Sequence, residues 1–408
     1  MKKIAFITLA SVLFTSNSFA QVVPGSDSDY LNNLNTISTS VPFLLIAPDS
    51  RAGAMGDVGA ATTPDHNSIH WNASKLAFLE EDNGFSLSYT PWLQDLVPEI
   101  SLSYLSGFKR LNSRSTIAGS MRYFSLGEIQ FTSSNNENLG KFSPNEFAFD
   151  GAYSMKLSEN FSTGMAMRYI YSNLTGGINV DNGPATKPGT SFGVDLSSYY
   201  QSNEFEIDDK TAYWAAGVNI SNVGNKISYT DGGEEHFLPT NGRLGVNLNM
   251  ELDDYNSVSF AFDVNKLLAP TPPVYAVDED GNSLFDENGD RVIEAGKNPN
   301  VGTIAGIFQS FNDAPGGIQE EFNEVMFAAG MEYWYLKQFA FRGGYFHEHE
   351  NKGNRKYFTL GVGLRMNVFS LDMAFLLPAT QGTRSPLANT LRFTMLFDMA
   401  ALYATDKE

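Results

Sequence analysis

The chain has 408 residues, of which 27 are Lys or Arg and 46 are Asp or Glu, so its formal net charge is −19. This acidic balance argues against a nucleic-acid partner, because a phosphate backbone repels an acidic surface. The sequence contains no cysteine, which excludes a disulfide framework and suits a large barrel. Aromatic residues make up 13% of the chain although its mean hydropathy is only −0.21, a combination typical of outer-membrane barrels, whose strands are apolar on one face only.

Residues 1–20 have the features of a secretory signal peptide. Lys2 and Lys3 supply positive charge, residues 4–14 are apolar, and Ala20 precedes Gln21 at a small-residue cleavage site. The apolar stretch is too short for a membrane anchor, and no later run is long enough for a membrane helix. We therefore expect export, and we do not expect a lipoprotein, because no cysteine follows the cleavage site.

Residues 21–80, which we name the hatch, do not alternate between apolar and polar positions. They contain Pro42, Pro48 and Pro64 and a glycine-rich run at 51–59. The segment is too long and too apolar to be a mere tail. We expect it to lie inside or beneath a barrel, as a plug.

Residues 81–398 repeat one pattern about fourteen times: roughly ten residues, apolar at every second position, followed by a turn. In 356–366, for example, Phe358, Leu360 and Val362 share one face of the strand, and polar or small residues share the other. The strands are expected to start near residues 85, 99, 115, 145, 160, 190, 210, 240, 256, 325, 338, 356, 369 and 390. The pattern predicts an all-β fold, a 14-stranded antiparallel transmembrane β-barrel.

The connections between these strands alternate in length. Those at 109–114, 156–160, 336–337 and 367–368 are short, and those at 125–144, 172–189, 223–239 and 266–324 are long. Outer-membrane barrels have short periplasmic turns and long extracellular loops. We therefore predict an outer-membrane location, with the long loops outside and the N-terminus periplasmic or inside the barrel. The last strand ends at Phe397, and residues 399–408 form a tail.

The loop at 266–324 is by far the longest, and a loop of this size in a compact domain is usually functional. It leaves the barrel through the proline-rich run 269–273 and continues with acidic turns at 278–282 and 286–290. This part reads as a surface hairpin, which we name the acidic hairpin (residues 278–293). Residues 318–323 are expected to form a short helix.

Placing the apolar faces outward puts charges of both signs in the lumen: Arg168, Asp195, Arg243, Asp263, Arg342, Arg365, Asp372 and Arg392. In an open porin they would set up a transverse field across the channel. In a filled barrel they would form buried ion pairs that hold the plug, because charges away from water need partners. We favour the filled barrel, since the hatch needs a place.

The sequence predicts no metal, cofactor or catalytic centre. His66 and His70 are four residues apart but have one nearby carboxylate, and the turn at 286–290 lacks the spacing of a calcium-binding loop. The five histidines form no obvious group with a serine and a carboxylate, so we do not expect an enzyme.

Several motifs resemble those of the PorV (LptO) family, FadL-like barrels of the type IX secretion system of Bacteroidetes. The resemblance lies in 50–61 and 65–75, in 312–317, 341–348 and 351–358, and in 385–393. Its hatch signature consists of Arg51, Gly53, Met55, Gly56, Asp57, Trp71 and Asn72. FadL-like hatches usually have Asn-Pro-Ala where this chain has Asn72-Ala73-Ser74, which puts a transport role of the hatch in doubt but leaves the fold untouched.

The resemblance implies a barrel of fourteen strands, an N-terminal hatch and the binding of secreted proteins at the outer surface of the membrane. The family binds the C-terminal domain of secreted proteins, accepts them from the SprA translocon and delivers them to the PorU sortase, which attaches them to surface lipopolysaccharide. Candidate residues for binding cargo or partners are Phe285, Arg291, Phe346, His347, His349 and Arg355. The alternative, from the shared fold, is a FadL-like transporter of hydrophobic small molecules.

Overall fold

The computed structural model describes residues 34–92, 99–132, 138–177, 185–280, 282–379 and 390–399. The predicted signal peptide, residues 21–33 of the hatch, the motif residues 385–389 and the tail from 400 onward lie outside the described residues. The described residues from 36 onward form one compact unit. No helix among the described residues has the length and apolar content needed to cross a membrane.

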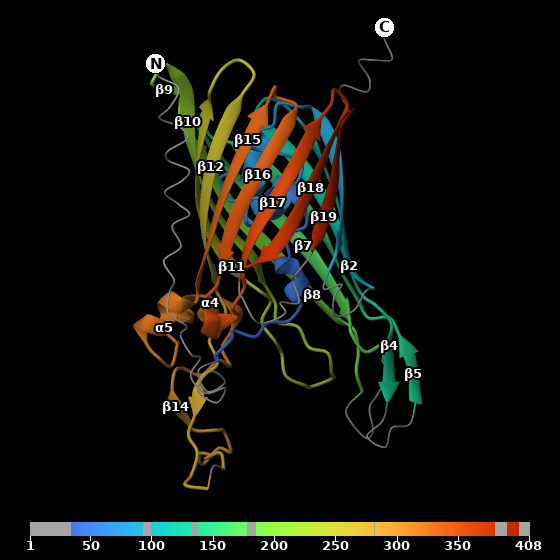
Figure 1. Ribbon diagram of the computed structural model, residues 1–408. Coiled ribbons are helices and arrows are strands. Elements are labelled where there is room, and N and C mark those ends of the chain that lie inside the picture. The colour runs from blue at the N-terminus through green and yellow to red at the C-terminus, as the bar shows by residue number, and fades with distance from the viewer. Residues whose placement is uncertain are drawn as a thin grey trace. The chain divides into compact units, whose positions relative to one another are not determined.

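Within the described residues, fourteen antiparallel strands close into a barrel, as predicted (Figure 1). Each barrel strand pairs with the barrel strands before and after it in the sequence, and the first strand pairs with the last to close the ring. A short extra strand, β9 (Phe205–Ile207), extends β10 only. The fourteen barrel strands are β1 (Asn83–Pro91), β2 (Ile100–Arg110), β3 (Ser115–Leu126), β6 (Asn145–Lys156), β7 (Phe161–Asn173), β8 (Gly189–Gln201), β10 (Lys210–Gly224), β11 (Asn241–Glu251), β12 (Ser257–Leu267), β15 (Val325–Tyr335), β16 (Phe339–His347), β17 (Lys356–Arg365), β18 (Phe369–Pro378) and β19 (Leu391–Asp398).

The closing seam joins β1 to β19 in register. Phe85 pairs with Phe397, and their rings stack with centroids 4.7 Å apart. Along the strands the predicted alternation is present: in β17, Phe358 and Leu360 are exposed on the outside, whereas Thr359 between them is buried inside. Because successive side chains point to opposite faces, every strand presents an apolar outer face, as a bilayer requires. The protein is therefore placed in the outer membrane.

Short and long connections lie at opposite ends of the barrel (Figure 1). The two-residue turn of Leu336 and Lys337, both with positive φ, has the backbone of a tight β-hairpin. At the other end are the hairpin of β4 (Ile129–Thr132) and β5 (Asn138–Phe142) and the loop 268–324.

The loop 268–324 contains β13 (Val274–Tyr275), β14 (Ile293–Ala295), α4 (Thr303–Gln309) and α5 (Ile318–Asn323). The predicted hairpin is present, with bridges from Phe285 to Arg291 and from Val277 to Ser283. The predicted helix is present as α5, whereas α4 was not expected. A further turn of 3-10 helix, η4 (Glu350–Lys352), lies between β16 and β17.

The described part of the hatch lies inside the barrel. It contains η2 (Pro42–Leu45), α2 (Ser50–Gly53), α3 (Ser68–Trp71) and η3 (Ala73–Phe78). Its backbone N–H groups bond to side chains on well-separated strands: Ser50 to Thr394 on β19 at 2.8 Å, and Ala77 to Ser154 on β6 at 3.1 Å. The N–H of Gly59 also bonds to Asp263 on β12 at 2.7 Å, so the described hatch lies inside the lumen between these three strands.

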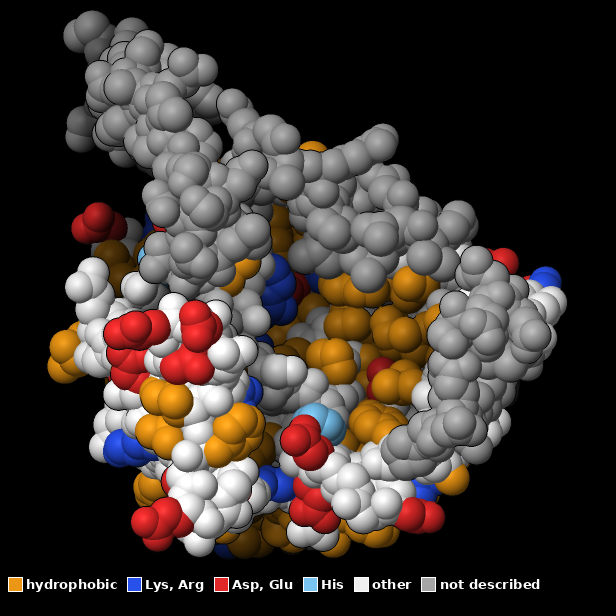
Figure 2. All heavy atoms as spheres, turned by 90° about the horizontal axis from the view of Figure 1, so that it is seen from below, with side chains coloured by type: hydrophobic (Ala, Val, Ile, Leu, Met, Phe, Trp, Pro, Cys, Tyr) orange, Lys and Arg blue, Asp and Glu red, His pale blue; other side chains and the backbone are white. Residues whose placement is uncertain are grey.

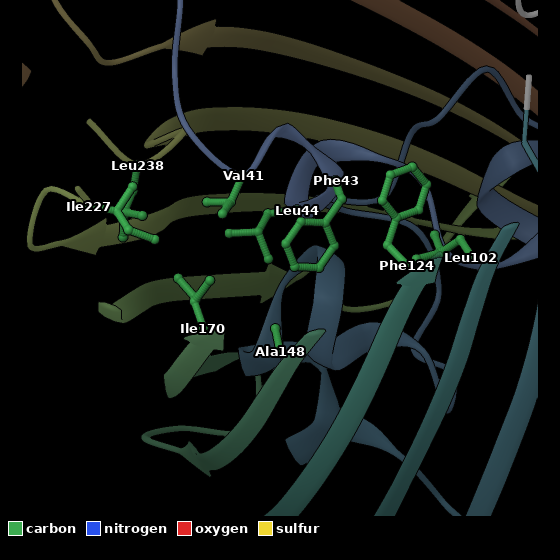
Figure 3. Close-up of a cluster of buried hydrophobic side chains, with 9 residues drawn as sticks. All are labelled: Val41, Phe43, Leu44, Leu102, Phe124, Ala148, Ile170, Ile227 and Leu238. Carbon is green, nitrogen blue, oxygen red and sulfur yellow. The ribbon is translucent and has the colours of Figure 1, made fainter. Parts of the chain in front are cut away.

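The apolar core therefore forms between the hatch and the wall rather than within either. Figure 3 shows Phe43 and Leu44 of the hatch directed at side chains from β2, β3 and β7. Phe43 stacks on Phe124 with ring centroids 6.1 Å apart. Burying these side chains against each other contributes about 1.5–3 kcal/mol for each, which favours a hatch that folds onto the wall.

Candidate functional site

The hatch and the wall share a row of buried ion pairs. Arg51 of the hatch binds Asp65 at 3.0 Å and Glu332 of β15 at 2.8 Å. Glu332 also binds Arg342 of β16 at 2.7 Å, and Arg342 binds Asp372 of β18 at 2.5 Å. No side chain in this row is more than 16% exposed. Because such charges are tolerated away from water only when paired, the row joins the hatch to three strands.

A second group of contacts holds the residues around Asp57. Its carboxylate accepts hydrogen bonds from Arg392 at 2.9 Å and from the hydroxyl of Tyr357 at 2.5 Å. Arg243 donates to the carbonyl oxygen of Asp57 at 2.7 Å and pairs with Asp263 at 3.2 Å. The carboxylate of Asp263 in turn accepts the backbone N–H of Gly59 at 2.7 Å. The hatch is thus tied to both sides of the lumen through one short loop.

A third group belongs mainly to the wall. Arg168 of β7 pairs with Asp150 of β6 at 2.5 Å and with Asp195 of β8 at 3.0 Å. Arg122 of β3 lies beside Asp150 at 3.7 Å and donates to the carbonyl oxygen of Leu44 at 3.0 Å, in the hatch. All four charged side chains are almost fully buried.

Seven of the eight charges that the sequence placed in the lumen make ion pairs there: Arg168, Asp195, Arg243, Asp263, Arg342, Asp372 and Arg392. Arg365 is the exception. It is exposed at the short-turn end of β17, where the strand continues past the hatch. Its guanidinium lies over the ring of Trp334, 4.4 Å from the centroid. The sequence analysis missed Arg122, Asp150 and Glu332, although each lies on the inward positions of its strand.

Glycines let the hatch backbone lie directly on the wall. A Cβ atom added to Gly217 would overlap the carbonyl oxygen of Ala60, and one added to Gly344 would overlap the backbone of Met55. Gly56 has a φ of +72°, and its added Cβ would come within 2.7 Å of the wall backbone. The signature residues Met55 and Gly56 therefore pack directly on the wall. The close approach is possible because Gly56 and the facing wall residue Gly344 have no side chain.

The signature residues Trp71 and Asn72 form hydrogen bonds within the hatch and to the wall. The indole N–H of Trp71 donates to Asp49 at 2.6 Å, and Asp49 also accepts the N–H of Ala52 at the start of α2. The amide of Asn72 donates to the carbonyl oxygens of Ala60 at 2.8 Å and Ser198 at 3.0 Å. Asn72 is also the N-cap of η3, which makes Ala73 the first residue of that helix. Proline is tolerated at a first helical position but is not needed there.

The predicted partner-binding residues fall into two separate groups. In the acidic hairpin, Phe285 is exposed and Arg291 lies over the ring of Tyr275 at 3.8 Å. At the end of β16, Phe346 is buried and stacks on Tyr357 at 5.0 Å. The prediction for Phe346 is therefore corrected: it shares the inward face of β16 with Arg342, and it is not available to a partner.

The remaining candidates around Phe346 are engaged locally. Arg355 pairs with Glu348 at 2.8 Å, and its guanidinium lies 5.4 Å from the Phe346 ring. His347 lies 3.3 Å from the hydroxyl of Tyr345, and His349 accepts the N–H of Asn351. This leaves the acidic hairpin as the more accessible of the two groups. Among the described residues, no cluster of three or more His, Asp or Glu side chains is placed to hold a metal ion.

The base of the loop 268–324 is ordered by buried polar contacts. Thr271 donates its backbone N–H to Asp313 at 3.2 Å and its hydroxyl to Glu324 at 2.7 Å. Burial raises the pKa of Asp313 above its ordinary value, and the hydrogen bond from Thr271 opposes that rise. The loop is therefore fixed at its base and carries the acidic hairpin on a defined support.

Several solved structures are similar to this chain. They include the Ralstonia pickettii toluene transporter TbuX (13% identity, TM-score 0.43, 86% of this chain and 96% of that one). They also include the Pseudomonas putida toluene transporter TodX (9%, 0.44, 86% and 97%) and a Pseudomonas aeruginosa FadL homologue (12%, 0.41, 90% and 99%). A comparison with curated proteins finds no match. The family model described as type IX secretion system protein PorV matches residues 29–274, well over half of the sequence. The chain therefore belongs to the PorV family and takes part in type IX secretion.

Proposed function

We propose that this protein is a cargo-binding and partner-docking barrel of type IX secretion. It receives secreted proteins through their C-terminal signal domain from a SprA-like translocon. It then delivers them to a PorU-like sortase for attachment to lipopolysaccharide. In this role the barrel binds and hands over cargo at the outer surface, and no catalysis or cofactor is required of it.

The fixed hatch is the observation that carries this proposal. Its ion pairs run from Arg51 to β15 and from Asp57 to β19, and its backbone lies against wall glycines. Breaking a buried ion pair costs about 3–5 kcal/mol, so displacing the whole hatch for each passing protein would be expensive. Cargo is therefore handled outside the lumen.

The acidic hairpin offers the outer surface for this contact. Residues 278–293 carry six carboxylates against one arginine, and exposed apolar side chains lie between them. Acidic groups around an apolar centre favour a partner surface that is basic around an apolar centre of its own. Phe285 and Arg291 are the side chains we assign to this contact.

Deletion of 278–293, with Gly-Ser in place of the hairpin, tests the proposal. We expect the barrel to assemble normally, since the hairpin makes no part of the wall, and secreted proteins with the C-terminal signal domain to remain unattached. Phe285→Ser alone should weaken attachment, and Tyr255→Ser, at an exposed aromatic on the short-turn side, should not. Mild detergent extracts should contain SprA-like and PorU-like partners. Normal cargo attachment in the deletion strain would refute the proposal.

A second candidate is transport of hydrophobic small molecules. It is favoured by a hollow on the long-loop face that is lined by hydrophobic side chains (Figure 2). Trp92 and Leu126 are half-buried beside the apolar cluster of Phe43. This function predicts reduced uptake of fatty acids or aromatic compounds in a deletion strain. Unchanged uptake together with lost cargo attachment would exclude it.

A further inference from the structure

The two helices of the loop 268–324, and the turn that follows α4, expose large apolar side chains. Solvent-exposed apolar patches of this kind mark a contact with another apolar phase or surface. The five side chains concerned are between 58% and 78% exposed: Ile304, Phe308, Phe311, Ile318 and Phe322.

Each helix has an apolar side and a side that faces the protein. In α5, Ile318 and Phe322 lie four residues apart and share one face, whereas Glu320 and Glu324 share the opposite one. In α4, Ile304 and Phe308 share a face, and Gly306 on the other side is buried. The exposed apolar sides are therefore the outcome of how the helices are docked.

Lysines hold the acidic side of α5 against the barrel rim. Lys266 pairs with Glu321 at 3.1 Å and also with Glu324, and Lys352 pairs with Glu324 at 2.9 Å and with Glu320 at 2.5 Å. All these side chains are less than one fifth exposed. The glutamates are thus paired at the rim, and the outward side of α5 is left apolar.

The position of Lys266 places α5 relative to the bilayer. Lys266 lies at the same strand face as Phe262, which is exposed on the outside of β12 and stacks on Phe327 of β15. Four residues of strand separate the two, about 13 Å along a tilted strand. Lys266 is the last residue but one of β12 and so lies at the long-connection end of the wall, where we expect the outer headgroup region. Figure 1 shows α4 and α5 at the long-connection end of the barrel.

We propose that α4 and α5 lie in the interface of the outer leaflet, with their apolar sides in contact with lipid acyl chains beside β12 and β15. The apolar sides continue the lipid-facing surface of the wall, and the paired lysines and glutamates face the rim, as in interfacial amphipathic helices. The anchor does not depend on any cargo. It would hold the base of the loop at one height above the membrane.

Lipid contact can be measured directly, because the chain contains no cysteine and single-cysteine variants need no background changes. Phe322→Cys and Phe308→Cys carry a nitroxide label in the purified full-length protein, reconstituted in vesicles of phosphatidylethanolamine and phosphatidylglycerol. Leu360→Cys, on the lipid-facing wall, and Phe285→Cys, in the acidic hairpin, are the matched controls. The readout is collision of the label with oxygen, which partitions into lipid, and with a water-soluble nickel complex present on both sides.

We expect labels at 308 and 322 to collide with nickel several-fold less than the label at 285, and with oxygen nearly as often as the label at 360. If a label disturbs the helix, Ile318→Cys and Ile304→Cys repeat the measurement on the same faces. Nickel accessibility at all four sites equal to that at 285 would overturn the proposal. So would protection that arises only after a partner protein is added, since that result would assign the surface to protein and not to lipid.

Discussion

The ion pair between Asp57 and Arg392 gives the sharpest test of how firmly the hatch is held. Asp57 belongs to the hatch, and the side chain of Arg392 on β19 is only 3% exposed and forms no other salt bridge among the described residues. We predict that Asp57→Asn loosens the hatch. The backbone accepts this change, because Asp57 has a φ of 64° and asparagine favours that left-handed region.

The magnitude follows from the loss of one partner of a buried ion pair, which costs about 3–5 kcal/mol because the other charge stays buried without compensation. The hydroxyl of Tyr357, which donates to Asp57, keeps an amide oxygen as acceptor, so the charge dominates the effect. If the whole cost falls on the closed hatch, its opening becomes about a hundredfold to several thousandfold more frequent. Arg392→Met added to Asp57→Asn removes the orphaned charge and should restore most of the loss.

Trypsin provides the assay, because Arg51 and Lys75 of the hatch are buried and become cleavable only when the hatch opens. The cleavage rate follows the open population when reclosing is fast. Asp82→Asn is the control: it removes an exposed pair with Arg110, worth at most about 1 kcal/mol. A cleavage rate for Asp57→Asn no higher than that of the control would refute the reasoning.

Three further predictions concern the hatch and the loop 268–324. In Gly217→Ala the added methyl group should overlap the hatch backbone, destabilise the closed hatch by about 1–3 kcal/mol and raise the trypsin cleavage rate. Gly151→Ala, at a position with open space around it, should leave the rate unchanged. Equal cleavage rates for the two variants would contradict the packing argument. Trp71→Phe should leave a buried oxygen of Asp49 without its donor and lower the free energy of unfolding by about 1–3 kcal/mol. An unchanged melting temperature would contradict this prediction. Burial raises the pKa of Asp313, so the folded loop binds this proton more tightly than the unfolded chain does, and loop stability falls as pH rises from the ordinary aspartate range into the raised range. The protection of residues 303–324 from hydrogen exchange, relative to the intrinsic exchange rate at each pH, should fall over that range, and Asp313→Asn should remove this loss of protection.

Much of the barrel could be predicted because its signal is local. The period of two in 356–366 depends only on the pleat, and the short turn at 336–337 only on two backbone conformations. The same alternation was sufficient to predict that Phe346 is unavailable to a partner. Phe346 lies four residues from Arg342 and hence on the same inward face of β16. The alternation could not place Arg365, because an inward position at a strand end faces water where the hatch no longer covers it.

By itself, the sequence determined the strand number, the sorting of short and long connections, the membrane-facing surface and the family resemblance, since each is set by residues close together in the chain. Only the tertiary structure decided which lumen charges are partners and which apolar residues remain uncovered. Asp57 and Arg392 are 335 residues apart, and no local pattern connects them. Their pairing exists because closing the barrel brings β19 against a hatch that must satisfy every charge it buries.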